Sequence, residues 1–589
     1  SFWTVFGSLT FSTTGPVTIR EQDDTDLVGA NTAGTLNLTS FGAISDGSSG
    51  TDISVTGNAS FYAAFAISIG GDGGETTHFG SLDATVVSTV RTVTIIEDSQ
   101  MNLNAVSGTT VTLRSETGAI VDNNGPSTNI SATFAALTAV GGIGDGTVLE
   151  TAVTNLAFWN TSGGDVEITN SGALTIAAIG TLPTSYSAGG VTITAGSPIT
   201  FAVNTSSVST ATYTSNDDNG AGLDNITVNS NVTVEVTGAN QDLIFQSGDQ
   251  IIINTNATVR STGSGGNVVL ESGYNDADND GSMTLDGTVS AASTITLDLN
   301  DEAGAGTQTA GSITATNLQL LSGTGGGSFA LSAGTNDVGT IAAASDGSIA
   351  YRDTNALIVG TVSTAGITTS NDDVTLCAAS FSLTQNISAG AGTVRLSASS
   401  GGITQTGGAI TASALGVAAG TNVSLPNAND VDTFAASLGG ALSFADSDGF
   451  TIGSVASLWC FPGATGITGA TDVELCTGGN LNITTALNAS GTVRLNTSSG
   501  NITQSGTGVI TAANVGARAS GNVDLNTLAN AVSGTFAARS NMGVVEFQNN
   551  QGFAVGTITA GASCFPATAG ATTANGNIDI DANAGNLTV

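Results

Sequence analysis

A short acidic stretch carries the clearest chemical signal in this sequence. Asp276, Asp278 and Asp280 occupy alternate positions and are followed by Gly281. Carboxylates spaced in this way before a glycine open a calcium-binding loop, because Ca²⁺ prefers oxygen ligands and the glycine permits a sharp turn. The glutamate that usually closes such a loop at position twelve is replaced by Gly287. Two interpretations stay open: a calcium site formed by the three aspartates, or an Asp- and Asn-rich turn of an acidic protein.

The four cysteines occupy equivalent positions in a repeated sequence. Cys377 precedes Cys476 by 99 residues, and Cys460 and Cys564 both begin a Cys-Phe-Pro sequence. One copy of the repeat contains both kinds of cysteine, Cys460 and Cys476. We therefore predict a disulfide between Cys460 and Cys476, which would add about 3 kcal/mol of stability in the chain-entropy model. Cys377 and Cys564 are expected to be buried free thiols, with a bond to an adjacent molecule as the alternative.

The sequence does not indicate a catalytic or cofactor-binding residue. His78 is the only histidine, so a histidine-based zinc site or a Ser-His-Asp triad has little support. The glycine-rich sequence 141–146 superficially resembles a phosphate-binding loop, but we expect no helix after it. Arg395 and Arg494 recur at equivalent positions, which favours a structural ion pair with an acid on a neighbouring coil over a unique active site. We predict that the protein is not an enzyme and that calcium is its one candidate cofactor.

The composition restricts the class of protein and of partner. Of the 589 residues 40% are hydrophobic and 9% are charged, so the chain can bury a core beneath a surface of Thr, Ser, Asn and Gly. Nine arginines, no lysine and 46 acidic residues give a net charge of −37, which disfavours nucleic acid and anionic membranes as partners. The longest apolar stretch, 61–69, is shorter than the roughly 20 residues of a membrane helix. We expect an extracellular protein, and the lack of a cationic leader predicts a mature chain or an internal fragment.

The C-terminal half repeats itself about every hundred residues. The sequence GTVRL at 392–396 returns at 491–495, and GSIAY at 347–351 is matched by GALSF at 440–444 and GVVEF at 543–547. Short alternating apolar runs separated by Gly, Asn, Asp and Ser indicate strands and tight turns, with little helix. The predicted segments are a diverged β-helix segment at 1–106, a β-helix at 107–289 with one diverged long repeat at 107–180, and repeat copies at 290–389, 390–487 and 488–589, the last of them open-ended.

Two architectures fit short strands in a hundred-residue repeat. One is a parallel β-helix, in which several coils make one repeat, and the other is a row of β-sandwich domains. The turns are short and proline-rich linkers are absent, so we predict the β-helix, with the apolar positions of 394–396 and Ile403, Ile410, Val423 and Leu425 facing inward. With about 20 residues per coil and strands about 4.8 Å apart, the chain would form about 29 coils and a rod of about 140 Å.

The strands at 500–505, 508–512, 521–526, 543–547 and 552–556 carry a further signal. Their succession resembles the repeats of filamentous-haemagglutinin-type surface proteins. The resemblance extends over 107–180 and 290–589. Members of that family are secreted bacterial adhesins with a right-handed parallel β-helix, so the resemblance implies this fold.

The repeats and the resemblance together predict a non-enzymatic, extracellular structural or adhesive protein that forms a rod or filament on the cell surface or in the matrix. The expected partners are further copies of the chain, joined head to tail or laterally, and carbohydrate or the surface of a host or neighbouring cell. Two other classes stay open. One is a β-helix enzyme that degrades polysaccharides, and the other is an ice- or crystal-binding surface, which the alternating threonines at 210–214 suggest.

Overall fold

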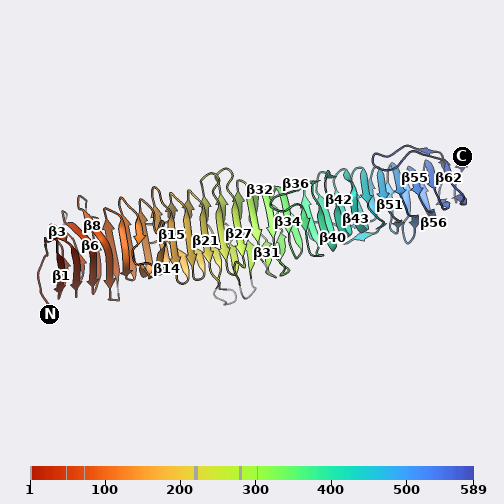
Figure 1. Cartoon of the computed structure of the whole chain (residues 1–589). Coiled ribbons are helices and arrows are strands. Elements are labelled where there is room, and N and C mark those ends of the chain that lie inside the picture. Colours follow the sequence, from red (N-terminus) through yellow and green to blue (C-terminus); the bar gives the residue numbers. More distant parts are fainter. Residues whose placement is uncertain are drawn as a thin grey trace. The chain divides into compact units, whose positions relative to one another are not determined.

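The chain is built from short parallel strands that stack coil upon coil. The computed structural model describes residues 3–47, 50–71, 73–89, 91–217, 223–276, 281–300 and 303–589. These residues form strands, turns and bends but no helix, and so no described segment is a helix that could cross a membrane. The architecture is a β-solenoid of about 23 turns with roughly 23 residues in each (Figure 1). The predicted parallel β-helix is therefore confirmed, whereas the coil is a few residues longer than expected and the number of coils is correspondingly smaller.

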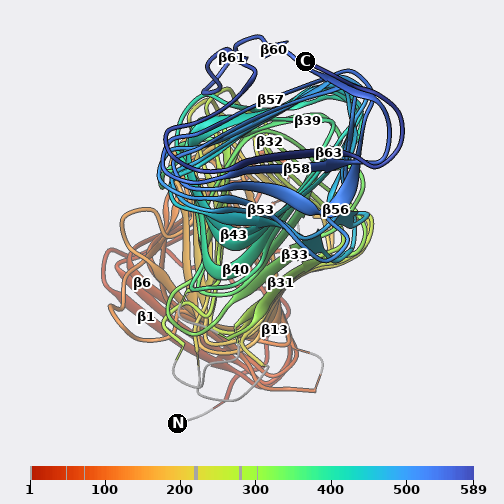
Figure 2. The same cartoon turned by 90° about the vertical axis from the view of Figure 1, so that its right-hand side faces the viewer.

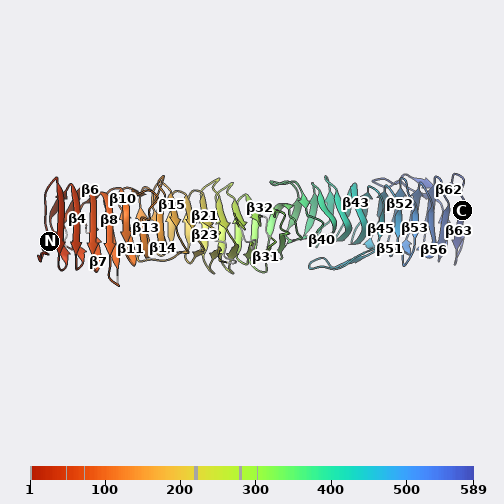
Figure 3. The ribbon, with the colours of Figure 1, turned by 60° about the horizontal axis from the view of Figure 1, so that its bottom comes forward.

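The solenoid divides into two compact units. The first comprises Ser1–Gly304 with Ala310–Ser312, and the second comprises Ala305–Thr309 with Ile313–Val589. Within each unit a strand pairs with its counterparts on the preceding and following coils, so that the strands lie side by side (Figure 3). A run in the first unit illustrates the register: β18 (Val191–Ala195) pairs with β21 (Ala211–Ser215), which pairs with β24 (Leu243–Ser247), which pairs with β27 (Val268–Ser272).

The interior of each unit consists of apolar side chains aligned from coil to coil. In the first unit Phe201, Tyr213 and Phe245 form an aromatic cluster with ring centroids 4.8–5.8 Å apart. In the second unit Phe434 stacks on Phe444 with a centroid distance of 4.2 Å. Such clusters fill the solenoid because alternate residues of a strand point to the same side. All the apolar residues that the sequence predicted to face inward are buried, namely Val394, Leu396, Ile403, Ile410, Val423 and Leu425.

Buried amide side chains close one corner of the coils in the second unit. The same arrangement recurs in three repeats, where a glutamine Nε2 donates to the Oδ1 of an asparagine about one coil later. Pairing two buried amides in this way satisfies polar groups that would otherwise cost free energy in the interior. The pairs are Gln308–Asn336, Gln405–Asn429 and Gln504–Asn530, with Nε2–Oδ1 distances of 2.9, 2.8 and 2.7 Å.

Two antiparallel hairpins interrupt the coils of the second unit, and we call them the first and second arms. The first arm contains β46 (Ser454–Val455) and β47 (Ala464–Thr465). The second arm contains β60 (Thr557–Ile558) and β61 (Thr568–Ala569), and in Figure 2 it lies outside the stacked coils. Each arm lies against a glycine of an outer coil surface. A Cβ at Gly416 would lie 2.7 Å from Cζ of Phe461, and a Cβ at Gly516 would lie 2.5 Å from Cζ of Phe565, so only glycine admits the two phenylalanine rings at these positions.

Candidate functional site

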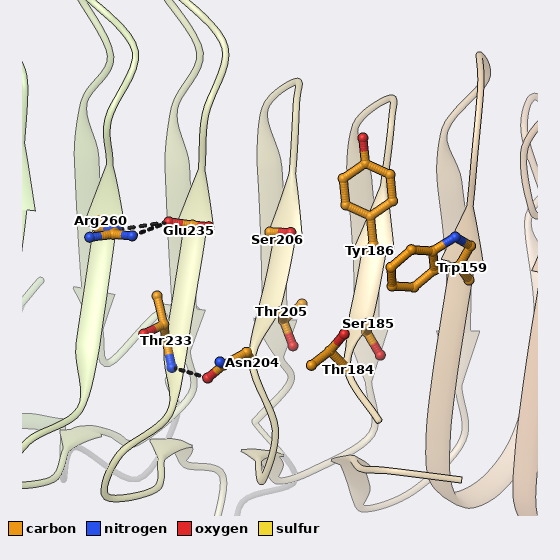
Figure 4. A pocket seen from close by; sticks show the side chains of 10 residues that line it. All are labelled: Trp159, Thr184, Ser185, Tyr186, Asn204, Thr205, Ser206, Thr233, Glu235 and Arg260. Atoms are coloured by element: carbon orange, nitrogen blue, oxygen red, sulfur yellow. Dashed lines mark hydrogen bonds and ion pairs between the residues drawn. The ribbon is translucent and has the colours of Figure 1, made fainter. Parts of the chain in front are cut away.

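One outer face of the first unit carries a row of aromatic, polar and charged side chains. The row runs over β14 (Leu149–Asn160), β17 (Ser185–Ser187), β20 (Thr205–Ser207), β23 (Thr233–Val236) and β26 (Thr258–Ser261). Successive pairs are in register from strand to strand, so the side chains stand beside one another on five consecutive coils (Figure 4). The row consists of Trp159, Tyr186, Ser206, Glu235 and Arg260.

Alternation along each strand explains why these residues face outward. In β17 Ser185 and Ser187 are buried and Tyr186 between them is not, and β23 shows the same pattern with Glu235 next to buried Val234. Neighbouring strands lie about 4.8 Å apart, so the row extends about 19 Å from Trp159 to Arg260. This length suits an extended ligand better than a compact one.

The aromatic end of the row is formed by Trp159 and Tyr186. Their ring centroids are 5.1 Å apart with an angle of 42° between the planes, and both side chains are partly exposed. Partly exposed Trp and Tyr rings combine an apolar face with a polar N–H or O–H group. They can therefore stack on the C–H face of a sugar ring while donating hydrogen bonds to its hydroxyl groups.

The charged end of the row is an ion pair. Arg260 Nη2 lies 2.6 Å from Glu235 Oε2, and its Nε donates to the same oxygen at 2.8 Å. The two side chains are 42% and 23% exposed, so the pair adds little to stability. It fixes the orientation of both groups, which leaves guanidinium and carboxylate atoms available to bind the hydroxyl groups of a ligand.

Between the two ends lies a pocket with a volume of about 210 Å³. The small side chain of Ser206 leaves this space open between Tyr186 and Glu235. At the lower edge in Figure 4, Thr233 N donates to Asn204 Oδ1 at 2.9 Å, and hydroxyl groups complete the lining. The pocket is lined by Trp159, Thr184, Ser185, Tyr186, Asn204, Thr205, Ser206, Thr233, Glu235 and Arg260.

The predicted calcium loop is only partly covered by the structure. Asp278 and Asp280 lie outside the described residues, so the arrangement of the three predicted ligands stays a prediction. Asp276 is described, and one of its carboxylate oxygens lies within 4.8 Å of one oxygen each of Asp217 and Asp249. The acid that the sequence pattern singled out is thus close to acids of other coils.

The predicted disulfide between Cys460 and Cys476 is wrong. The structure joins Cys377 to Cys460 and Cys476 to Cys564, with Cα–Cα distances of 6.3 and 6.1 Å. No cysteine is free, so the expectation of free thiols at Cys377 and Cys564 is wrong as well. The physical reason is the direction of the arms, because each arm folds back over the preceding coils. Cys460 of the first arm therefore meets Cys377, and Cys564 of the second arm meets Cys476. In both cases the partner is the cysteine on a coil strand of the preceding repeat.

The two recurring arginines help to hold the arms. Arg395 Nη1 lies 2.7 Å from Asp373 Oδ2, and its Nε donates to the carbonyl oxygen of Ala456, directly after β46 in the first arm. The predicted ion pair with an acid on a neighbouring coil is therefore confirmed for Arg395. Arg494 instead donates to the carbonyl and hydroxyl oxygens of Thr559 in the second arm, so it also contacts an arm, and it forms no ion pair with an acid among the described residues.

The threonine array needed for an ice-binding surface does not extend over the coils on both sides of β21. Thr212 on β21 aligns with Thr192 on the preceding coil but with Ile244 on the following one. Thr214 aligns with Thr194 and then with Gln246. Because an ordered lattice of threonines would have to continue over many coils, the sequence 210–214 gives no such surface.

Comparisons with known proteins give no relative for this chain. No protein-family model, no curated protein and no solved structure matches it. The solenoid and its pocket therefore have to be interpreted from their own geometry.

Proposed function

We propose that the protein is a non-enzymatic, extracellular adhesive protein that binds carbohydrate along the row from Trp159 to Arg260. The observation that carries the proposal is the alignment of an aromatic pair, a small residue and an ion pair on five consecutive coils. An oligosaccharide is an extended chain with apolar ring faces and hydroxyl edges. It matches a surface that offers aromatic rings at one end and hydrogen-bonding groups at the other, over about 19 Å.

Other features support the location and the class. Both disulfides favour an oxidising compartment, because thiols in the cytosol are usually kept reduced. The repeats resemble those of filamentous-haemagglutinin-type surface proteins, and a bacterial surface adhesin would use the solenoid to display the binding face. A rod or filament built from the chain, with further copies as partners, is part of the same proposal.

A glycan array followed by calorimetry tests carbohydrate binding. We expect selective binding of one class of oligosaccharide by the full chain, and at least a tenfold weaker affinity for Trp159→Ala and Tyr186→Ala. Tyr62→Ala is the matched control, because Tyr62 is an exposed aromatic residue on another strand, β6 (Asp52–Ala63). Absence of binding to any glycan, or equal losses in all three variants, would contradict the proposal.

A polysaccharide-degrading enzyme is the second candidate, and the contact between Glu235 and Arg260 favours it. An acid beside an arginine in a pocket is an arrangement that could act on a glycan. Glycoside hydrolysis, however, normally uses two carboxyl groups, and Glu235 is the one carboxylate among the residues that line this pocket. Release of reducing ends from a bound oligosaccharide, abolished in Glu235→Gln, would identify an enzyme and overturn the non-enzymatic proposal.

A further inference from the structure

Three acidic side chains from three consecutive coils converge at one corner of the first unit. Asp217 follows β21 by two residues, Asp249 follows β24 by two, and Asp276 follows β27 by four. These strands are paired in register, so the residues after them meet at the same corner. One carboxylate oxygen from each aspartate lies within 4.8 Å of the others.

Asp249 is the residue of this cluster that indicates a bound ligand. The residue has 0% exposure, and its Oδ2 accepts a hydrogen bond of 2.8 Å from Asp224 N. Its Oδ1 is buried and has no hydrogen-bond partner among the described residues. Burying a carboxylate oxygen without a partner is costly, and nearby carboxylates increase the cost by repulsion. A positive charge at this point would remove both penalties.

The same corner buries further oxygen atoms. The hydroxyl groups of Ser215 and Ser272, at the ends of β21 and β27, are both buried and lack hydrogen-bond partners in the part of the chain that the structure describes. Both align with Ser247 on the intervening coil. The corner therefore places neutral hydroxyl oxygens near the buried Asp249 carboxylate, and hydroxyl and carboxylate oxygens are the ligand types that a hard cation accepts.

We propose that Asp217, Asp249 and Asp276 bind a divalent cation, Ca²⁺, that joins three coils of the solenoid. Calcium accepts several carboxylate and neutral oxygen ligands in flexible geometry, whereas zinc and copper sites normally include nitrogen or sulfur ligands. The ligands come from separate coils, so this site differs from the linear loop that the sequence 276–280 suggested. The cation would hold the coils together at their corner.

A second acidic cluster in the same unit differs from this site in its exposure and hydrogen bonds. Asp145, Asp165 and Glu167 also place carboxylate oxygens within 4.8 Å of one another. Asp145 is exposed and Asp165 is partly exposed, and Asp165 and Glu167 accept hydrogen bonds from backbone N–H groups. Solvent and donors already stabilise these charges, so the group gives no reason to propose an ion.

Calorimetric titration of the chelator-treated full chain with CaCl₂ in 0.15 M NaCl tests the site. We expect one saturable site in the native protein and at least a tenfold weaker affinity in Asp249→Asn and Asp217→Asn. Asp430→Asn is the control: Asp430 is exposed on β43 (Val423–Leu438), and its replacement removes the same charge without touching the cluster. Its affinity should equal that of the native chain.

Thermal unfolding provides a second measurement, which also reveals a variant that fails to fold. Ca²⁺ should raise the melting temperature of the native chain and of Asp430→Asn, because a ligand that binds only the folded state stabilises it. Asp249→Asn should fold without Ca²⁺ and show no rise on its addition. Absence of a saturable site in the native chain, or an undiminished affinity and melting shift in Asp249→Asn, would overturn the proposal.

Discussion

The carboxylate of Glu474 accepts a hydrogen bond of 2.7 Å from the backbone N–H of Cys564, a residue 90 positions later in the chain. The N–H groups of Ala562, Ser563 and Phe565 donate to the same carboxylate at distances of 2.8–3.2 Å. Burial alone would raise the pKa of Glu474, but these backbone hydrogen bonds outweigh it and hold the pKa below its ordinary value. Glu474 therefore fixes the tip of the second arm as an anion bound by backbone donors.

The first prediction concerns this contact. Glu474→Gln places an amide N–H₂ group beside backbone donors and removes the charge, so the second arm should lose about 2–3 kcal/mol of local stability. Limited proteolysis should then cut the native chain slowly and the variant quickly within 557–569. Because the folded pKa of Glu474 is lowered, its contribution is present above the unfolded value of about 4.5 and is lost as the pH falls through the folded value. Equal cleavage rates at neutral pH would show that Glu474 does not hold the arm.

A surface pair provides the control for that experiment. Arg114 and Glu116 form an ion pair of 3.1 Å with side chains 52% and 37% exposed. Glu116→Gln also removes one negative charge, but the loss of an exposed pair should cost less than about 1 kcal/mol. Cleavage of the second arm should be unchanged in this variant.

The second prediction follows from a difference between the arms. Thr375 occupies the position of Glu474 in the preceding repeat, and its buried Oγ1 has no hydrogen-bond partner among the described residues. The first arm therefore lacks a carboxylate beneath its tip and depends more on the disulfide between Cys377 and Cys460. Reduction should increase hydrogen exchange at 454–465 at least tenfold more than at 557–569, as measured by mass spectrometry. A similar increase in both arms would contradict this difference.

The disulfides also show what the sequence can and cannot predict. Alternating apolar residues and turn residues act locally, so they predicted the strands, the parallel solenoid and the buried face of 394–425 from sequence alone. The pairing of Cys377 with Cys460 depends on how far the first arm folds back over the coils, which no local pattern encodes. Equivalent positions in two repeats suggested a bond within one copy, whereas the structure forms bonds between successive copies.

The row from Trp159 to Arg260 was missed for a related reason. Its residues are separated in the sequence by 27, 20, 29 and 25 positions, from Trp159 through Tyr186, Ser206 and Glu235 to Arg260. The coils differ in length because the turns and loops at their corners differ in size. The residues of the row therefore do not recur at a constant interval in the sequence. Only the strand register brings these five residues together.

The third prediction concerns pH and the buried carboxyl group of Asp446. Burial raises the pKa of Asp446 to about 7, and the neighbouring Asp448 adds to the rise, although a hydrogen bond from Val431 N partly offsets it. Between the unfolded value near 4 and the folded value near 7, the folded chain holds a proton that the unfolded chain has released. Stability should therefore fall as the pH rises through this window, by about 2–4 kcal/mol in total.

The chain itself contains the matched variant of this site. Asn549 occupies the same position one repeat later, where its Oδ1 accepts from Val532 N and its Nδ2 donates to the carbonyl oxygens of Val532 and Gln551. Asp446→Asn should reproduce this arrangement and remove the fall in stability, so that urea unfolding shows the variant to be more stable than the native chain above pH 7. Asp430→Asn, at an exposed position, should follow the native curve. Parallel pH curves for Asp446→Asn and the native chain would contradict the assignment.

The last prediction tests whether the space beside Ser206 is where a ligand binds. Ser206→Trp should fill the pocket between Tyr186 and Glu235 and abolish glycan binding, while leaving the melting temperature nearly unchanged because the side chain points outward. Ser290 aligns with Arg260 on the next coil, on β29 (Thr288–Ala291), and does not line the pocket. Ser290→Trp therefore adds the same bulk to the same row outside the pocket, and it should retain native affinity in the calorimetric assay. If both variants bind equally well, the ligand lies elsewhere on the solenoid; if both lose binding, the contact extends along the row beyond the pocket.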